Sequence, residues 1–238
     1  MNPIDYAIIH WYNHFALQSR QFDLFMVILL DATLLKGGVV VGVLWCVWFK
    51  RSEGITHTHE TVIALLAGAL LSMVIAKLFN TFVHFRPRPL DNAALAFQLP
   101  YGMKPRDLGD WGTFPSDHAA MFFAFATGFF YVTRRLGILV TLFVTFVICV
   151  PRMYAGMHYP SDILFGALIA VLSTVATNSA RVKAWLSGHV LPWERTSPGL
   201  FYATLFLLTY QMATLFIDVR TMSIHVQDLL IKVLHATL

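Results

Sequence analysis

The sequence is poor in cysteine, and this shortage excludes one class of fold. Only Cys46 and Cys149 occur in 238 residues, so the disulfide framework of a small secreted domain is not available. Both cysteines lie inside apolar segments, where a disulfide between neighbouring helices is possible and a small buried hydrophobe is the favoured interpretation. The opening MNPIDYAIIHWYNHF also lacks the basic segment and cleavage site of a signal peptide, so we expect it to remain in the mature protein.

Charge is scarce as well, because Asp, Glu, Lys and Arg make up 13% of the residues while 57% are hydrophobic. An apolar fraction this high exceeds that of a soluble globular domain. Several apolar runs approach the ~20 residues that a helix needs to cross a bilayer. We therefore predict an all-α, polytopic membrane helix bundle with about six transmembrane helices, at residues 25–49, 61–83, 119–132, 136–150, 163–180 and 200–217.

Short amphipathic segments flank these spans. The opening residues predict an interfacial helix with Trp11, Tyr12 and Phe15 at headgroup level. The last residues, SIHVQDLLIKVLHATL at 223–238, have an apolar spacing that suits an amphipathic helix at the outer surface. We treat residues 1–238 as a single domain, in which 198–238 add a span and this tail.

The basic residues indicate how the chain crosses the membrane. The formal charge of +4 could suggest nucleic acid, but the basic residues form short clusters after spans and no stripe with exposed aromatics, so we expect no nucleic-acid partner. By the positive-inside rule the loops that carry them are cytoplasmic. These residues are Lys50, Arg51, Arg134, Arg135, Arg181, Lys183 and Arg195.

Alternation then brings three polar stretches to the opposite, non-cytoplasmic face. FRPRP at 85–89 ends the second span, FPSDH at 114–118 opens the third, and PRMYAGMHYPSD at 151–162 joins the fourth and fifth. The loop at 90–113 lies on the same face and is long for a compact bundle, so we expect a partly ordered lid or substrate rim. Pro115 stands just before the third span, which leaves Ser116 or Asp117 as its N-cap.

The third stretch has the composition of a nucleophilic site. His158 and Asp162 are spaced i, i+4, so a helix beginning near His158 would place the carboxylate one turn from the imidazole and fix its tautomer. Arg152 precedes His158 by six residues and can clamp phosphoryl oxygens with its planar fork. Alone, such a histidine is more often an ordinary interfacial residue. Its arginine and aspartate neighbours favour an oriented nucleophile.

The other two stretches supply an anion site and an acid. His118 and Ser116 stand at a helix N-terminus, where backbone amides and the helix dipole favour an anion. Arg86 and Arg88 arrive from the second span, on the face where topology anchors should be scarce. One histidine that attacks and one that donates a proton suit in-line phosphoryl transfer.

A metal site is the alternative use of these residues. His118, His158, Asp117 and Asp162 form a two-histidine, two-carboxylate set. Arginines crowded around such a site would repel a cation, so we expect neither a metal nor another cofactor.

Together these residues resemble the signature of the type-2 phosphatidic acid phosphatase and vanadium haloperoxidase superfamily. The resemblance lies in Arg88-Pro89, in Pro115, Ser116 and His118, and in Arg152, His158 and Asp162, and it covers about residues 61–180. It implies a catalytic core there, with His158 forming a phosphohistidine, Asp162 supporting it, and His118 acting as the acid that later activates water. It also implies that Arg88, Arg152 and Ser116 bind phosphate.

Two positions depart from the superfamily pattern. The superfamily lysine would fall at Thr81, and the nearest lysine, Lys77, is a candidate substitute that either reaches the phosphate or points into a wet cavity. Asp117 stands where a glycine is usual. In both respects, and in its PSDH and opening IIHWYNH, the chain is similar to the bacterial undecaprenyl-diphosphatase branch. This similarity implies a metal-independent hydrolase that converts undecaprenyl diphosphate to undecaprenyl phosphate. We expect it in the bacterial cytoplasmic (inner) membrane, with its site facing the periplasm or exterior.

The sequence is also compatible with other substrates and other functions. The lipid could instead be phosphatidylglycerol phosphate, phosphatidate or a lipid A phosphate, and the oligomeric state is not encoded in any pattern we identify. A non-enzymatic lipid transporter or binder on the same architecture is the alternative from another class. Transporters often carry internal repeats and charges deep in their spans. We find no clear repeat and no deep charge beyond Lys77, which disfavours that class.

Overall fold

The computed structural model describes residues 2–50, 55–83, 85–103, 112–219 and 221–222, and within these ranges it contains helices and no strands. The all-α prediction is therefore confirmed. The longer helices are α1 (Pro3–His14), α2 (Arg20–Asp31), α3 (Val39–Trp48), α4 (Ile55–Phe82), α5 (Asp117–Val132), α6 (Arg134–Phe143), α8 (Pro160–Thr177), α9 (Ala180–Thr196) and α10 (Pro198–Ala213). Shorter elements are π-helices η1 (Leu34–Gly38) and η4 (Val144–Cys149), 3-10 turns η2 (Pro89–Asp91) and η3 (Ala93–Leu95), and α7 (Val150–Tyr154).

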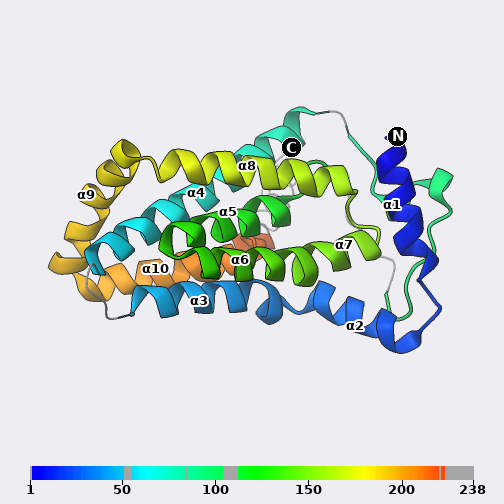
Figure 1. Cartoon of the computed structure of the whole chain (residues 1–238), viewed down its shortest axis with the longest axis horizontal. Coiled ribbons are helices and arrows are strands. Elements are labelled where there is room, and N and C mark those ends of the chain that lie inside the picture. Colours follow the sequence, from blue (N-terminus) through cyan, green and yellow to red (C-terminus); the bar gives the residue numbers. More distant parts are fainter. Residues whose placement is uncertain (1, 51–54, 84, 104–111, 220, 223–238) are drawn as a thin grey trace, which may run out of the picture.

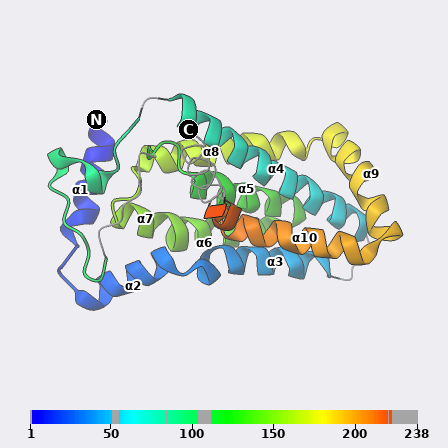
Figure 2. The same ribbon diagram turned by 180° about the vertical axis from the view of Figure 1, so that it is seen from behind.

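The centre of the bundle is the packing of α4, α5 and α8 (Figure 1). Small residues on α5, among them Ala119, Ala120 and Ala124, are fully buried and let the neighbouring helices approach closely. Phe122, Phe125 and Phe129 fill the remaining space. The second view shows α3 and α10 lying along the bundle on the other side from α8 (Figure 2).

The six predicted spans all fall on helices, but they differ in length. Among the described residues, three helices are long and apolar enough to cross a membrane alone: Thr56–Phe82, Arg134–Tyr154 and Pro160–Thr177. α5 and α10 have 16 residues each, which is ~24 Å of helix against a hydrocarbon core of ~30 Å. Large apolar side chains such as Leu164 and Leu139 are exposed on the outside of the bundle, as a lipid-facing surface requires.

The first predicted span, 25–49, is not one straight helix. α2 and the segment Leu34–Trp48 meet at an angle of 67° and count as a fourth span only if the bent pair is taken together. Two charged residues flank the break: the exposed Asp31 ends α2, and the buried Lys36 lies in η1. The expectation of no deep charge beyond Lys77 overlooked Lys36. Gly37 explains the local geometry, because a Cβ at this position would lie 2.0 Å from the carbonyl oxygen of Ala213. The backbone of α10 therefore packs directly on the break.

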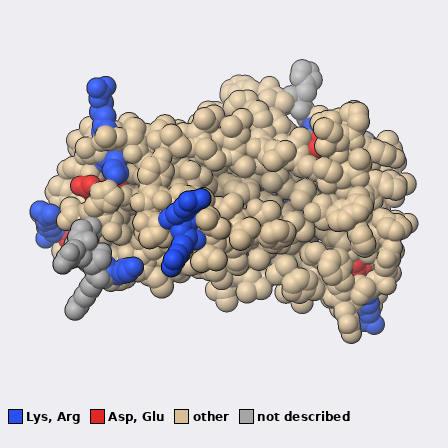
Figure 3. All heavy atoms as spheres, viewed as in Figure 1, with Lys and Arg blue, Asp and Glu red and all other residues tan. Residues whose placement is uncertain are grey.

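The helix directions separate two ends of the bundle. α4 ends, and α5 and α8 begin, toward the end that carries α1, whereas α6 begins toward the opposite end, where α9 lies (Figure 1). On the face shown in Figure 3, lysine and arginine side chains gather on the half that contains α9. The basic side chains and the three polar stretches therefore lie toward opposite ends of the bundle, as the positive-inside rule predicts for a non-cytoplasmic site.

The sequence also made predictions about the N-terminal helix, the C-terminal tail and the two cysteines. The N-terminal helix forms, capped by Asn2, with Trp11 and Phe15 exposed. The tail 223–238 lies outside the described residues. Both cysteines are free; Cys149 is buried as expected, but Cys46 is exposed because it faces outward from α3, so the prediction of a buried residue was wrong there.

Candidate active site

The three polar stretches meet at the end of the bundle beside α1. Backbone hydrogen bonds join them: Thr113 N–H donates to the Arg86 carbonyl at 3.0 Å, and Ser116 N–H donates to the Asp162 carbonyl at 3.1 Å. Leu90 N–H donates to the Gly156 carbonyl at 3.0 Å. Backbone hydrogen bonds thus hold together segments that are far apart in the sequence, and they fix the Cα positions from which the side chains of the site extend.

One glycine makes this close assembly possible. A Cβ on Gly166 of α8 would lie 2.6 Å from the backbone oxygen of Ser116 and 3.0 Å from the Ala119 Cβ. Only a residue without a side chain lets α8 approach the first turn of α5 at this distance. Gly166 therefore sets the spacing between the two helices whose N-termini carry the site.

His158 and Asp162 lie close together but not in the direct contact that their spacing predicts. The α8 helix begins at Pro160, two residues later than expected, and His158 Nδ1 is 3.9 Å from Asp162 Oδ2. Thr113 bridges the gap: its hydroxyl donates to Asp162 Oδ2 at 2.6 Å and lies 3.1 Å from His158 Nδ1. Asp162 Oδ2 also accepts the Tyr159 N–H at 2.7 Å, which caps α8. The carboxylate thus acts on the imidazole through a hydroxyl.

These contacts set the state of the His158 ring. Nδ1 is 3.0 Å from the Thr113 carbonyl oxygen, which can only accept, so the proton belongs on Nδ1 and the lone pair on Nε2. Burial, followed by the nearby charge of Arg152, lowers the pKa of His158 to about 3. A neutral imidazole with Nε2 unprotonated is the form that can attack phosphorus.

Asp162 is held from its other side by Arg86. Arg86 Nη1 donates to Asp162 Oδ1 at 2.7 Å, and Nη2 donates to Asp5 Oδ2 at 2.7 Å. Its guanidinium lies 3.9 Å from the centre of the Tyr159 ring. The sequence predicted Arg86 beside the phosphate. In the structure its guanidinium binds the carboxylates of Asp162 and Asp5, so it orients Asp162.

Asp5 brings the N-terminal helix into the site, which no sequence pattern suggested. Its carboxylate accepts from Ser161 N–H at 2.9 Å and from the Ser161 hydroxyl at 2.6 Å, and it is 1% exposed. Burial works against the charged form, but the hydrogen bonds from Ser161 and Arg86 outweigh it, so the pKa of Asp5 is lowered. The only sequence signal was an acidic residue on the apolar side of an amphipathic helix.

His118 lies between Asp117 and Arg152. Its Nδ1 is 3.1 Å from Asp117 Oδ1, and its Nε2 contacts Arg152 Nη2. Because a guanidinium can only donate, Nε2 is the acceptor and Nδ1 carries the proton to Asp117. The charge of Arg152 acts on both His118 and His158.

The two departures from the superfamily pattern contact each other. Lys77 Nζ lies 3.5 Å from Asp117 Oδ2, while Asp117 Oδ1 contacts His118. Lys77 is linked to His118 through the unusual aspartate.

Ser116 stands at the start of α5, and Arg88 contacts the backbone just before His158. Ser116 is the N-cap of α5: its Oγ accepts the Ala119 N–H at 3.4 Å, which leaves its hydroxyl proton to donate elsewhere. Arg88 Nη1 donates to the Met157 carbonyl at 3.4 Å. Burial lowers the pKa of Arg88, while Asp117, Asp91 and Asp162 act in the opposite direction, so the guanidinium stays charged.

The proposed two-histidine, two-carboxylate metal set is not assembled as a ligand cluster. Asp162 uses Oδ2 for Thr113 and for the Tyr159 N–H, and Oδ1 for Arg86. In the part of the chain that the structure describes, no group of three or more His, Cys, Asp or Glu residues is arranged to hold a metal ion.

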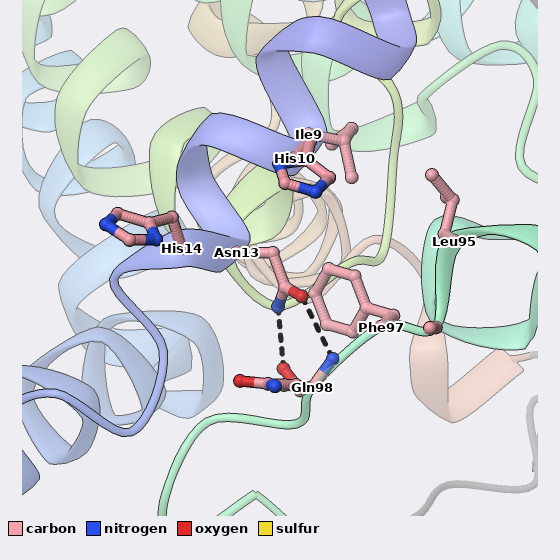
Figure 4. Close-up of a pocket in the computed structure, with 8 residues that line it drawn as sticks. Ile9, His10, Asn13, His14, Leu95, Phe97 and Gln98 are labelled. Atoms are coloured by element: carbon pink, nitrogen blue, oxygen red, sulfur yellow. Dashed lines mark hydrogen bonds between the residues drawn. The ribbon is translucent and has the colours of Figure 1, made fainter.

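The loop expected to form a lid is described at 90–103 and at 112–113, and its described part is docked on α1. Asn13 donates to the Gln98 carbonyl at 2.7 Å and accepts the Gln98 N–H at 3.0 Å (Figure 4). A cavity of about 230 Å³ beside this pair is lined by His10, His14 and Phe97 among others. α1 therefore supports both the rim loop, through Asn13, and the site, through Asp5.

Comparison with known proteins gives matches over the same core. Residues 61–186 match the profile described as the PAP2 superfamily. The bacitracin transport permease protein BcrC of Bacillus licheniformis is 28% identical over 114 residues, which are 48% of this chain and 50% of that protein. The putative undecaprenyl-diphosphatase YbjG of Escherichia coli K12 is 27% identical over 139 residues, 58% of this chain and 64% of that protein. The chain thus matches about half to two thirds of the length of these relatives.

A solved structure agrees with these matches. The crystal structure of Aquifex aeolicus LpxE superposes with a TM-score of 0.52 and 25% sequence identity, covering 72% of this chain and 92% of that one. The superposition therefore includes most of the bundle and extends beyond the segment matched by the profile.

Proposed function

This chain belongs to the PAP2 superfamily, and from that premise we propose that it is an integral membrane lipid phosphatase that works through a phosphohistidine. The observation that carries the proposal is the pairing of a neutral, buried His158 with the charges of Arg152 and Arg88. A nucleophile with its lone pair available, beside fixed positive charge, is what in-line attack on a phosphoryl group needs.

The reaction runs in two displacements. Substrate binding draws Arg152 from His118 Nε2 to the phosphoryl oxygens, and His118 then carries a second proton on Nε2. In the first displacement, His158 Nε2 bonds to phosphorus as the bond to the leaving oxygen breaks, and His118 gives that second proton to the leaving oxygen. Arg88, Arg152 and the Ser116 hydroxyl bind the phosphoryl oxygens, whose charge is greatest in the transition state. In the second, His118 takes a proton from water, the resulting hydroxide attacks phosphorus, and the P–N bond breaks to release inorganic phosphate.

The positive charge that develops on His158 explains why its supports matter. Once Nε2 is phosphorylated the ring is cationic, and Nδ1–H then donates more strongly to Thr113. Asp162 stabilises this state through the Thr113 hydroxyl, and Arg86 and the Tyr159 N–H keep the carboxylate in place. Asp162 is a positioning residue in this scheme, acting through Thr113.

For the substrate we propose undecaprenyl diphosphate, cleaved to undecaprenyl phosphate and phosphate at the outer face of the bacterial cytoplasmic membrane. Support comes from the likeness to YbjG, whose name states this activity as putative, and from the PSDH stretch and missing lysine shared with that branch. The basic loops at the end opposite the site support an outward-facing site. We propose no metal requirement, because arginines occupy the anion site.

A panel of purified lipids tests the substrate. The protein in detergent should release phosphate from undecaprenyl diphosphate with a kcat/KM at least tenfold above that for phosphatidylglycerol phosphate, phosphatidate and lipid A phosphates. Rapid turnover of one of these lipids with undecaprenyl diphosphate untouched would replace the substrate and keep the chemistry. Activity lost to a chelator and restored by a divalent cation would contradict metal independence.

The name of BcrC, a transport permease, gives one specific reason to test a transporter. His158→Ala separates the two functions: a phosphatase loses essentially all turnover while the protein remains folded. A transporter would keep its transport, and retained hydrolysis in this variant would contradict the phosphohistidine.

A further inference from the structure

A cavity of about 290 Å³ opens beside the site where the first span breaks. Its polar lining is Lys36, His118 and Arg152, together with the exposed Asp31 and Thr33 of the break. The rest is mainly apolar and comes from Leu30, Phe122, Met157 and the end of α10. Cavities that take small molecules begin at about this size and combine apolar walls with a few convergent polar groups.

Lys36 is the unusual member of this lining. It comes from the break in a predicted membrane span and is 8% exposed, and its Nζ donates to the Leu30 carbonyl at 2.5 Å. Burying an ammonium group at membrane depth is costly, so an ionisable residue there is by default a functional candidate. Its charge acts on His118, which places it near the acid of the proposed reaction.

The break that carries Lys36 is a built feature. Gly37, the next residue, allows the Ala213 backbone of α10 to pack against η1. Ala213 also lines the cavity, so this contact fixes the end of α10 beside Lys36. Besides its hydrogen bond to the Leu30 carbonyl, Lys36 shares this cavity with two residues of the proposed site, His118 and Arg152.

The position of the cavity relative to the two histidines suggests its use. His118 and Arg152 line it, whereas His158 is not among its lining residues. In an in-line displacement the leaving group departs on the side opposite the nucleophile. The cavity is thus on the side of the acid, where the leaving group must go.

Building on the proposed function, we infer that this cavity is the leaving-group subsite and that Lys36 binds the lipid-proximal phosphate of a diphosphate. As the His158 Nε2–phosphorus bond forms, the bond from the terminal phosphorus to the bridging oxygen breaks. That oxygen, on the departing lipid phosphate, takes the His118 proton, and Lys36 offsets the charge on the other oxygens. The apolar wall takes the first part of the lipid chain.

This assignment predicts a preference set by one residue. A diphosphate lipid places a phosphate beside Lys36, whereas the leaving group of a monophosphate lipid is an alcohol and places none there. Loss of the Lys36 charge should therefore penalise diphosphates selectively.

The test uses farnesyl diphosphate and farnesyl monophosphate, which share one tail, with the full chain purified in detergent. Lys36→Gln should lower kcat/KM for the diphosphate by ~10- to 100-fold and for the monophosphate by less than ~3-fold. Lys36→Arg should recover most of the loss, and Lys50→Gln, at the far end of α3, is the matched control. Inhibition by inorganic pyrophosphate should weaken in Lys36→Gln while inhibition by inorganic phosphate stays unchanged.

The outcomes separate this inference from the proposed function. Equal losses on both substrates, or an unchanged pyrophosphate inhibition in a variant with the wild-type melting temperature, would overturn the subsite alone. A wild-type protein that hydrolyses farnesyl monophosphate and leaves farnesyl diphosphate and undecaprenyl diphosphate untouched would overturn the proposed diphosphatase function as well.

Discussion

Thr113→Val is the perturbation that probes the site most selectively, because it removes one hydroxyl and nearly conserves shape. The hydroxyl donates to Asp162 Oδ2 at 2.6 Å and lies 3.1 Å from His158 Nδ1. The Thr113 carbonyl, which also accepts from His158, remains in the variant. The link between ring and carboxylate is lost, together with the 3.2 Å contact from the hydroxyl to the Met157 carbonyl.

The size of the effect follows from that link. A hydrogen bond to a charged group contributes about 1.5–3 kcal/mol, and about 1.4 kcal/mol corresponds to tenfold in rate. Since the link strengthens when His158 becomes cationic, most of this energy should appear in the transition state. We expect kcat to fall by ~10- to 100-fold with KM nearly unchanged, because Thr113 does not contact substrate in the proposed scheme.

The assay is steady-state phosphate release, with two companion variants. Thr113→Ser keeps the hydroxyl and should stay within about threefold of wild type. Thr141→Val makes the same change at a helical threonine whose hydroxyl bonds the Gly137 carbonyl, and should be neutral for kcat. A Thr113→Val protein that is stable and fully active would refute the relay, as would a loss confined to KM.

Two further predictions concern the supports and the protonation of the nucleophile. Asp5→Asn should destabilise the protein by about 1–3 kcal/mol and lower kcat severalfold, because Arg86 loses one of the two carboxylates it holds. Since the folded-state pKa of Asp5 is lowered, the stability that its charge contributes is fully present above pH ~4 and is lost as the pH falls through the lowered pKa. The difference in thermal stability between wild type and variant should therefore shrink as the pH falls below ~4, and a difference that stays constant throughout acidification would contradict the assignment. The pKa of His158 is lowered to about 3, so the rate of phosphate transfer to the enzyme from a substrate with a good leaving group should change by less than ~3-fold between pH 7 and pH 5. An imidazole with the ordinary pKa would lose ~25-fold in rate over the same range. A loss of that size in single-turnover experiments would contradict the lowered pKa.

The sequence predicts much of this molecule where a pattern is local or set by topology. Apolar runs located the helices, and the proline of PSDH restricted the N-cap of the third span to Ser116 or Asp117, of which the structure has Ser116. The alternation of spans brought Arg88, His118 and His158 to one end. The helix positions and the grouping of these residues at one end follow from the order of the spans along the chain and from the cost of burying charge in a membrane.

What the sequence did not predict depends on contacts between distant segments. The bridge through Thr113 exists because α8 starts two residues later than the i, i+4 spacing assumes, a boundary that helix patterns locate poorly. Asp5 and Arg86 meet across 81 positions, and neither residue type alone identifies its partner. Lys36 could have been noticed, because it stands beside Gly37 in a predicted span, but the apolar average of that segment concealed it.

The measurement that tests the central claim most directly is chemical trapping of the intermediate. Wild-type protein, mixed with undecaprenyl diphosphate carrying ³²P in the terminal phosphate and quenched in denaturant at alkaline pH, should carry label that is stable to base and labile to acid. Peptide mapping should place that label on His158, and His158→Ala should carry none. Full turnover by a protein that never becomes labelled, or label on a different residue, would contradict the account.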